Sequence, residues 1–211
     1  MKIASLSLTV LAGVMMTACS SNAPSMPSAA ESTASQAAHA DSKACPKSVV
    51  YVSSGRNGTV EIYDRANLKG APCGSITGLQ EPQGLFVDSK GNLWVADAAT
   101  QRVYVFAPGN PGAIETLDDP DGQPAAVTVD EKSNIVYVTE YKNNMDATNL
   151  VQVYKNGSTM PNSTLSDPSA RNGGFAAVDA SGNLYVTFMT QSNTAQVDEW
   201  SGGSGTPKNL G

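Results

Sequence analysis

The polar residues that could do chemistry in this chain gather in a few loops that follow apolar strands. Their carboxylate, amide and guanidinium groups could hydrogen bond to a polar ligand, and the carboxylates could ligate a hard cation such as Ca²⁺. We expect these loops to contact whatever the protein binds. The candidate residues are Gln83, Asp119, Asp121, Glu140, Tyr141, Asn143, Asn144, Asp146, Arg171 and Asn172.

The acidic run Leu117-Asp-Asp-Pro-Asp-Gly122 suggests calcium but does not match the EF-hand loop. Aligning Gly122 with the glycine of that loop places Leu117 and Thr128 where the motif requires carboxylates. Two interpretations remain, a solvated acidic turn and a loose surface cation site. We therefore predict no resident cofactor, metal or catalytic residue, and keep Ca²⁺ only for the enzyme alternative given below.

The chain lacks the residue combinations of common catalytic sites. Its single histidine, His39, lies in a stretch rich in Ser, Ala and Pro, and no Gly-x-Ser-x-Gly motif, phosphate-binding glycine loop or Cys/His pair occurs. The 13 Lys and Arg residues, against 19 Asp and Glu, form no basic run. This charge pattern disfavours a nucleic-acid partner.

The N-terminus is typical of an exported protein. Lys2 precedes a mostly apolar run over residues 3–16, and Met16-Thr-Ala-Cys19 resembles the bacterial lipoprotein cleavage box. This resemblance implies that residues 1–18 are a signal peptide and that Cys19 carries a lipid anchoring the protein at the cell envelope, on the periplasmic or surface side. The alternative is an ordinary signal peptide cut near Ala18 or further on. Residues 19–44 are mostly Ser, Ala and Pro, which predicts a disordered tether.

A repeat organises residues 45–211. Apolar strands begin at residues 50, 93, 136 and 184, and each is followed by a strand with alternating apolar positions. Three are preceded by another strand that runs into a turn starting at Asp88, Asp130 or Asp179. Aspartate suits such turns, so we assign these three a structural role. With a weaker fourth strand, each unit of about 43 residues is typical of a β-propeller blade.

The second unit, residues 82–106, resembles the NHL repeat. It contains Pro82-Gln-Gly84, a strand, Asp88-Ser-Lys-Gly-Asn92, Leu93-Trp-Val-Ala-Asp97 and Arg102-Val103 in the order of that repeat. The resemblance covers residues 47–211 and implies an all-β fold, a β-propeller with about four recognisable four-stranded blades. The first blade lacks its innermost strand. In such a repeat, Asp97 is expected to fix a loop between strands.

The strand count bears on how the propeller closes. Related six-bladed, TolB-like propellers usually close by pairing strands from both termini, and no spare strand is present here. We interpret the chain as a truncated six-bladed propeller or as one part of an assembly, with a closed four-bladed ring as the alternative. Cys45 and Cys73 are expected to form a disulfide in an exported compartment, and a free thiol pair is the alternative.

Loop lengths point to one face of the propeller. The spacing from second to third strand is 10 residues in the first two units, from 50 to 60 and from 93 to 103, but 15 and 13 in the last two, from 136 to 151 and from 184 to 197. Loops that grow on a rigid scaffold tend to carry binding residues. We therefore expect an envelope-anchored binding or scaffold module for a protein, peptide or glycan partner.

The enzyme alternative is a calcium-dependent lactonase or hydrolase of the gluconolactonase type. Pro82-Gln83-Gly84-Leu85 resembles the Pro-Asn-Gly-Leu motif of that family. Gln83 replaces the asparagine that ligates the metal there, which places the metal site in doubt.

Overall fold

The structure is a computed structural model that describes residues 45–120, 122–141 and 150–211. The predicted signal peptide and tether, with Cys19, lie outside the described residues. The candidates Asp121, Asn143, Asn144 and Asp146 also lie outside them. The domain boundaries assigned to residues 1–44 therefore stay predictions.

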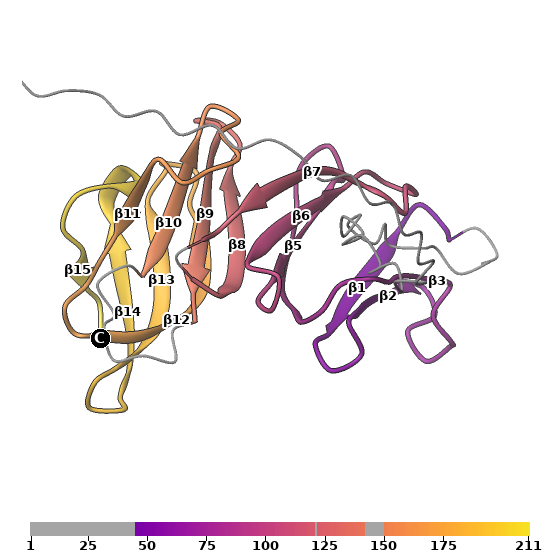
Figure 1. Ribbon diagram of the computed structural model, residues 1–211, viewed down its shortest axis with the longest axis horizontal. Coiled ribbons are helices and arrows are strands. Elements are labelled where there is room, and N and C mark those ends of the chain that lie inside the picture. The colour runs from indigo at the N-terminus through magenta and orange to yellow at the C-terminus, as the bar shows by residue number, and fades with distance from the viewer. Residues whose placement is uncertain (1–44, 121, 142–149) are drawn as a thin grey trace, which may run out of the picture. The chain divides into compact units, whose positions relative to one another are not determined.

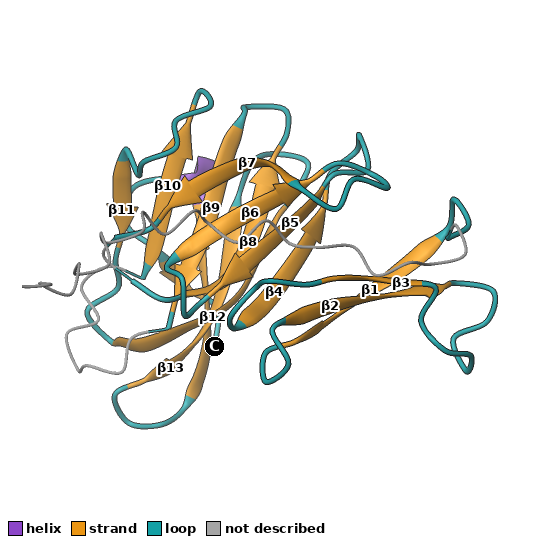
Figure 2. Ribbon diagram, turned by 45° about the vertical axis from the view of Figure 1, so that its right-hand side comes forward, coloured by secondary structure: helices purple, strands orange, loops and turns teal. Residues whose placement is uncertain are grey.

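The described strands form four antiparallel sheets, in which consecutive strands are neighbours (Figures 1 and 2). The first sheet has three strands and the other three have four. In chain order the sheets contain β1 (Val49–Ser54), β2 (Thr59–Asp64) and β3 (Gly74–Ile76); β4 (Pro82–Val87), β5 (Leu93–Asp97), β6 (Arg102–Phe106) and β7 (Ala113–Asp118); β8 (Pro124–Asp130), β9 (Ile135–Glu140), β10 (Val151–Lys155) and β11 (Ser163–Leu165); and β12 (Ala170–Val178), β13 (Leu184–Thr190), β14 (Ala195–Trp200) and β15 (Lys208–Asn209).

These sheets are the blades of a β-propeller, and they confirm the predicted all-β fold class. Among the described residues, the first blade has no innermost strand, in agreement with the prediction, because β1 corresponds to the second strand of the other blades. The one helical element among the described residues is a 3-10 turn, η1 (Ser201–Gly203), after β14. We refer to the sheets as blades 1 to 4 in chain order.

The turns between the first two strands of blades 2, 3 and 4 confirm the structural role of their aspartates. Asp88 Oδ1 accepts the N–H groups of Lys90 and Asn92 at 3.0 and 2.8 Å, and Asp179 Oδ1 accepts those of Ser181 and Asn183 at 2.8 and 2.9 Å. Asp130 Oδ1 makes the same kind of bond to Lys132 and Ser133. The N–H of Asn183 is the main cause of the lowered pKa of Asp179.

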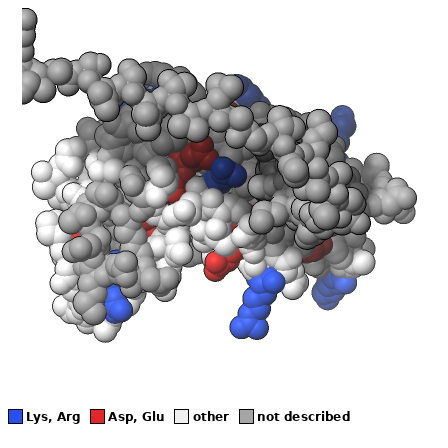
Figure 3. Space-filling model, viewed as in Figure 1, with Lys and Arg blue, Asp and Glu red and all other residues white. Residues whose placement is uncertain are grey.

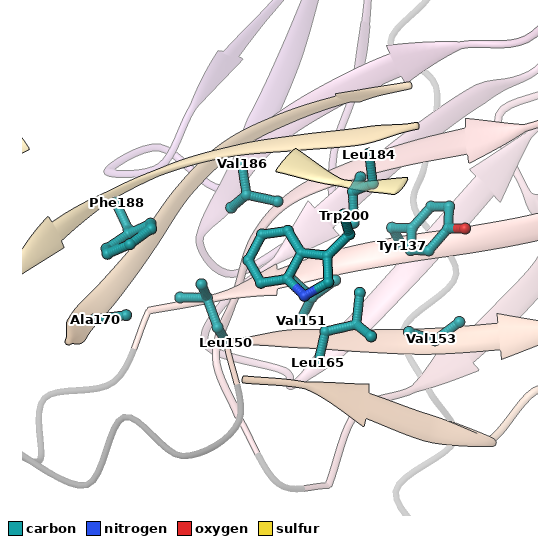
Figure 4. Close-up of a cluster of buried hydrophobic side chains, with 10 residues drawn as sticks. All are labelled: Tyr137, Leu150, Val151, Val153, Leu165, Ala170, Leu184, Val186, Phe188 and Trp200. Atoms are coloured by element: carbon teal, nitrogen blue, oxygen red, sulfur yellow. The ribbon is translucent and has the colours of Figure 1, made fainter. Parts of the chain in front are cut away.

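The core consists of three hydrophobic clusters, each between two consecutive blades. The cluster between blades 3 and 4 surrounds Trp200 with Leu150, Leu165 and Leu184 (Figure 4). Val103 and Tyr154 contribute to the cluster between blades 2 and 3. In the part of the chain that the structure describes, no such cluster joins blade 4 to blade 1.

A disulfide joins Cys45 to Cys73, whose Cα atoms are 5.3 Å apart. Cys45 lies shortly before β1, and Cys73 lies directly before β3. The bridge therefore links the starts of two strands that flank β2 on opposite sides.

Within the described ranges, no helix combines the length and the apolar character that crossing a membrane requires.

Candidate functional site

The candidate site is a hollow of about 510 Å³ where blades 1 and 2 meet. Its lining comes from three segments: the loop between β1 and β2, the connection from β3 to β4 with the start of β4, and the loop between β5 and β6. The loops between the second and third strands of each blade lie on the face where the sequence predicted binding. The lining residues are Gly55, Arg56, Gln80, Glu81, Gln83 and Ala99.

Asp97 fixes the connection that forms one wall of this hollow. Its side chain is fully buried at the end of β5, and its carboxylate accepts the N–H groups of Gln80 and Glu81 at 2.9 and 2.6 Å. The expectation that Asp97 fixes a loop is confirmed. Because the two amides are held by a buried anchor, the exposed side chains of Gln80 and Glu81 start from a fixed backbone.

Hydrogen bonds within the wall also fix Gln83. Its side-chain Nε2 donates to Glu81 Oε1 at 3.1 Å. Its backbone carbonyl accepts a hydrogen bond from the Ser53 hydroxyl at 2.7 Å. The Glu81 carboxylate retains acceptor capacity after accepting this amide, because an ionised carboxylate has about four lone-pair sites. The wall thus presents amide and carboxylate groups in a defined arrangement.

Arg56 supplies the positive charge of the hollow. Its side chain is exposed, and the ion pair found among the described residues lies elsewhere, between Arg102 and Asp118 at 2.9 Å. On the face drawn in Figure 3, the basic groups stand apart from one another, and one of them lies beside acidic groups. A guanidinium in this setting can bind a carboxylate or phosphate through two parallel N–H bonds.

Glu140 occupies the position in blade 3 that Asp97 occupies in blade 2. Each ends the second strand of its blade and pairs with the proline that starts the first strand, Pro124 for Glu140 and Pro82 for Asp97. Glu140 is only 1% exposed, and its carboxylate lies where a Cβ at Gly122 would be. The side chain of Glu140 is one methylene longer than that of Asp97. The missing side chain of Gly122 leaves space for the Glu140 carboxylate.

The other described candidates are divided between the interior and the rim of the binding face. Asp119 is fully buried in the connection between blades 2 and 3, where its N–H donates to the Gln101 carbonyl at 2.9 Å. Tyr141 is 46% exposed, just after β9.

Arg171 and Asn172 lie on β12, and Arg171 Nη1 donates to Asn193 Oδ1 at 2.7 Å. Of the described candidates, Gln83 alone lines the hollow.

Three polar residues of the hollow, Arg56, Gln80 and Glu81, are absent from the candidates chosen from the sequence. The candidates were drawn mainly from the longer loops of the binding face, and Arg56 lies in one of the short loops. Position in the repeat would have found them, since they lie in the same types of loop and connection as the chosen residues. No group of three or more His, Cys, Asp or Glu residues is placed to hold a metal ion in residues 45–120, 122–141 and 150–211.

Comparisons with known proteins agree with the repeat analysis. A family model described as the NHL repeat matches residues 79–106, which contain β4, β5 and β6 together with part of the hollow. No curated protein sequence matches the chain.

Solved structures share the fold at low sequence identity. The chain is similar to one in hydrazine synthase from Kuenenia stuttgartiensis, with TM-score 0.63, 17% identity and coverage of 76% of this chain and 45% of that one. A chain of the nidogen/laminin complex gives TM-score 0.62, 16% identity and coverage of 77% and 60%. For a chain of the mitotic checkpoint complex the TM-score is 0.56, the identity 16% and the coverage 75% and 46%. The matched part therefore spans about half of the length of these neighbours and shows the β-propeller fold.

Proposed function

We propose that the blades form a recognition scaffold that binds a protein or peptide partner on the face of the long loops. The observation that carries this proposal is the hollow, in which three segments from two blades bring together one guanidinium, one carboxylate and two side-chain amides. Such groups match the backbone and acidic side chains of a peptide. Arg56 would receive a carboxylate of the partner, and Gln80 and Gln83 would hydrogen bond to its amides.

Binding of an extended partner suits a repeat scaffold. Tyr141, directly after β9, and Arg171 and Asn172, at the start of β12, lie at the same ends of their blades as the segments that line the hollow. Among the solved neighbours, one comes from a nidogen/laminin complex and another from the mitotic checkpoint complex. These titles describe those proteins, and they support a binding role here only by analogy of fold.

The test is binding of the full chain, in detergent, to arrays of peptides and of glycans. Arg56→Ala should weaken binding of the selected peptide at least tenfold, which corresponds to about 1.4 kcal/mol. Lys90→Ala is the matched control, because it removes the same charge from the turn between β4 and β5. Equal affinity of both variants would contradict the role of the hollow.

Two other outcomes would redirect the proposal. Selective binding to glycans would replace the peptide partner. Calcium-dependent turnover of a generic lactone would favour the enzyme alternative of the gluconolactonase type and contradict a purely binding role.

We further propose that the chain is held at the cell envelope by a lipid on Cys19, with residues 19–44 as tether. The Met16-Thr-Ala-Cys19 sequence supports this proposal. In a bacterial host, wild-type protein should partition into detergent and Cys19→Ala should move to the aqueous phase. Detergent partitioning of Cys19→Ala equal to that of wild type would contradict lipid attachment at this residue.

A further inference from the structure

The strand β1 forms one edge of blade 1. Blades 2, 3 and 4 carry a further strand at the corresponding position, where β4 pairs with β5, β8 with β9 and β12 with β13. Among the described residues, β2 is the one strand that pairs with β1. A strand edge of this kind presents backbone N–H and C=O groups to which an extended chain can bind.

The register of β1 identifies the groups on this edge. Arg65 N–H donates to the Ser48 carbonyl at 3.2 Å, so these two residues form a hydrogen-bonded pair between β1 and β2. Such pairs alternate along an antiparallel ladder, so the backbone groups of every second residue, counted from Ser48, bond to β2. Those of Val49, Tyr51 and Ser53 point to the open edge, and in the described ranges no backbone group bonds to them there.

Blade 2 shows how a strand uses the equivalent edge. Tyr51 corresponds to Trp94 of β5, since the repeat starts at residues 50 and 93. Trp94 pairs with Phe86 of β4, and the hydrogen bond from Asp88 N–H to the Asn92 carbonyl, two register positions away, makes this pair hydrogen-bonded as well. Trp94 belongs to the cluster of blades 2 and 3, and Phe86 packs against that cluster. Because Tyr51 packs against the cluster of blades 1 and 2, a strand on β1 would place an apolar side chain beside it.

The hollow lies where such a strand would begin. A chain antiparallel to β1 starts beside Ser54, the last residue of β1. A Cβ on the next residue, Gly55, would lie 3.5 Å from Glu81 Cγ and 3.5 Å from the Pro82 carbonyl oxygen, so the hollow directly follows the strand end. Residues just ahead of an added strand would therefore pass Arg56, which lines the hollow.

The end of β1 differs from the strand ends that hold a blade connection. In blades 2 and 3 the corresponding position carries a buried acid, and in blade 2 this acid, Asp97, holds two N–H groups of the connection into β4. In blade 1 the residue is Ser54, whose hydroxyl is neutral. Glu81, the other charged residue of the lining, accepts the Gln83 amide. Arg56 thus offers the cation to an incoming chain, and the edge suits a separate peptide with an acidic residue ahead of its strand.

We propose that the partner of the hollow is an extended peptide that adds to β1 as an antiparallel strand and completes blade 1 with a fourth strand. One of its apolar residues lies beside Tyr51, and an acidic residue ahead of the strand binds Arg56. Hydrogen bonds to the backbone of Tyr51 and Ser53 supply affinity, and the two side-chain positions supply specificity. This inference rests on the binding function proposed for the hollow.

The probe is a synthetic peptide with the sequence of residues 79–88, which contains the chain's own example of such a strand, with Glu81 ahead of it. It should bind the full chain, in detergent, saturably below about 1 mM. N-methylation of Phe86 in the peptide removes the N–H directed at the receiving strand and should weaken binding at least tenfold. N-methylation of Leu85 is the matched control, because its N–H points away from that strand, and it should weaken binding less than about threefold.

Exchange of individual amides of the full chain locates the peptide independently. Saturation with the probe should slow exchange at Tyr51 and Ser53 at least tenfold. Exchange at Val50 and Val52, whose N–H groups bond to β2, should change less than about twofold. Arg56→Ala should weaken binding of the probe at least tenfold.

The binding function of the hollow and the strand addition fail in different ways. Arg56-dependent binding without protection of Tyr51 and Ser53, or with equal losses from the two N-methylated peptides, would overturn strand addition and leave the hollow as a binding site. Protection of these amides by a probe whose affinity is unchanged in Arg56→Ala would contradict the function proposed for the hollow, and with it the acidic contact.

Two further results would overturn the inference. One is absence of probe binding at about 1 mM. The other is slow exchange of Tyr51 and Ser53 before the probe is added, because another segment of the chain or a second copy would then occupy the edge.

Discussion

Single carboxylates fix the connections of this propeller from inside the fold. Asp97 holds two successive amides of the connection between blades 1 and 2, and the turn aspartates Asp88, Asp130 and Asp179 hold amides of their hairpins. Repeated acidic residues could be taken for a catalytic set. Their hydrogen bonds to backbone N–H groups explain them as structural residues instead.

Asp97→Ala should lower the free energy of unfolding by about 2 kcal/mol, because it leaves the amides of Gln80 and Glu81 without their buried acceptor. Urea denaturation followed by circular dichroism would measure the loss. Asp97→Asn should lose less, since it keeps one acceptor oxygen. Glu115→Ala, on β7, should change stability by less than about 0.5 kcal/mol, and an equal loss in both positions would contradict the anchoring role.

The strands could be predicted from the sequence because alternation of apolar residues and turn chemistry are local signals. The weaker fourth strand predicted for each unit is present in blades 2, 3 and 4, for example β11 (Ser163–Leu165) in blade 3. The hollow could not be found in the same way. It depends on which loops of neighbouring blades meet in space, and Arg56 and Glu81 lie in segments whose lengths are ordinary.

Close approach of the innermost strands depends on one glycine of the NHL-like segment. A Cβ at Gly84 of β4 would lie 2.6 Å from Ala126 Cα and 2.8 Å from the Ala125 carbonyl oxygen, both on β8. Gly84→Ala should therefore destabilise the chain by about 2 kcal/mol through overpacking against backbone. Gly112→Ala is the matched control, because its Cβ would meet only the Asn110 side chain at 3.6 Å. A thermal melt showing equal stability of the two variants would disprove this packing argument.

The disulfide should stabilise blade 1 more than any other part of the chain. Cys45 and Cys73 are separated by 28 residues, and a loop of this size predicts about 3.6 kcal/mol from restriction of the unfolded chain. Reduction with dithiothreitol, or the Cys45→Ala/Cys73→Ala variant, should lower the melting temperature and expose amides of β1 to β3 to exchange. Unchanged exchange in these three strands would contradict the assignment.

At the scale of the whole molecule, the hydrophobic contacts that stabilise the fold lie between consecutive blades. Each hydrophobic cluster belongs to one pair of consecutive blades. A repeat protein of this kind has a stability that is approximately the sum of repeat and nearest-neighbour terms. Damage at one junction should therefore remain local until the next junction also fails.

Trp200→Ala tests this organisation. Trp200 is fully buried in the cluster of blades 3 and 4, so its truncation should cost about 3 to 5 kcal/mol. Hydrogen exchange should show lost protection in β12 to β14 and in β9 and β10, while β1 to β3 keep theirs under mild conditions. Uniform loss of protection in all four blades would show that the molecule unfolds as a single cooperative unit instead.

The bridge between Cys45 and Cys73 also sets how the molecule would bear mechanical load. Tension applied on the N-terminal side of Cys45 reaches the start of β1 through the chain and the start of β3 through the sulfur atoms. Because β1 and β3 flank β2 on opposite sides, the pull is divided between both neighbours of the middle strand. The disulfide then prevents β1 from separating from β2 on its own. Under load, the three strands of blade 1 would unfold together.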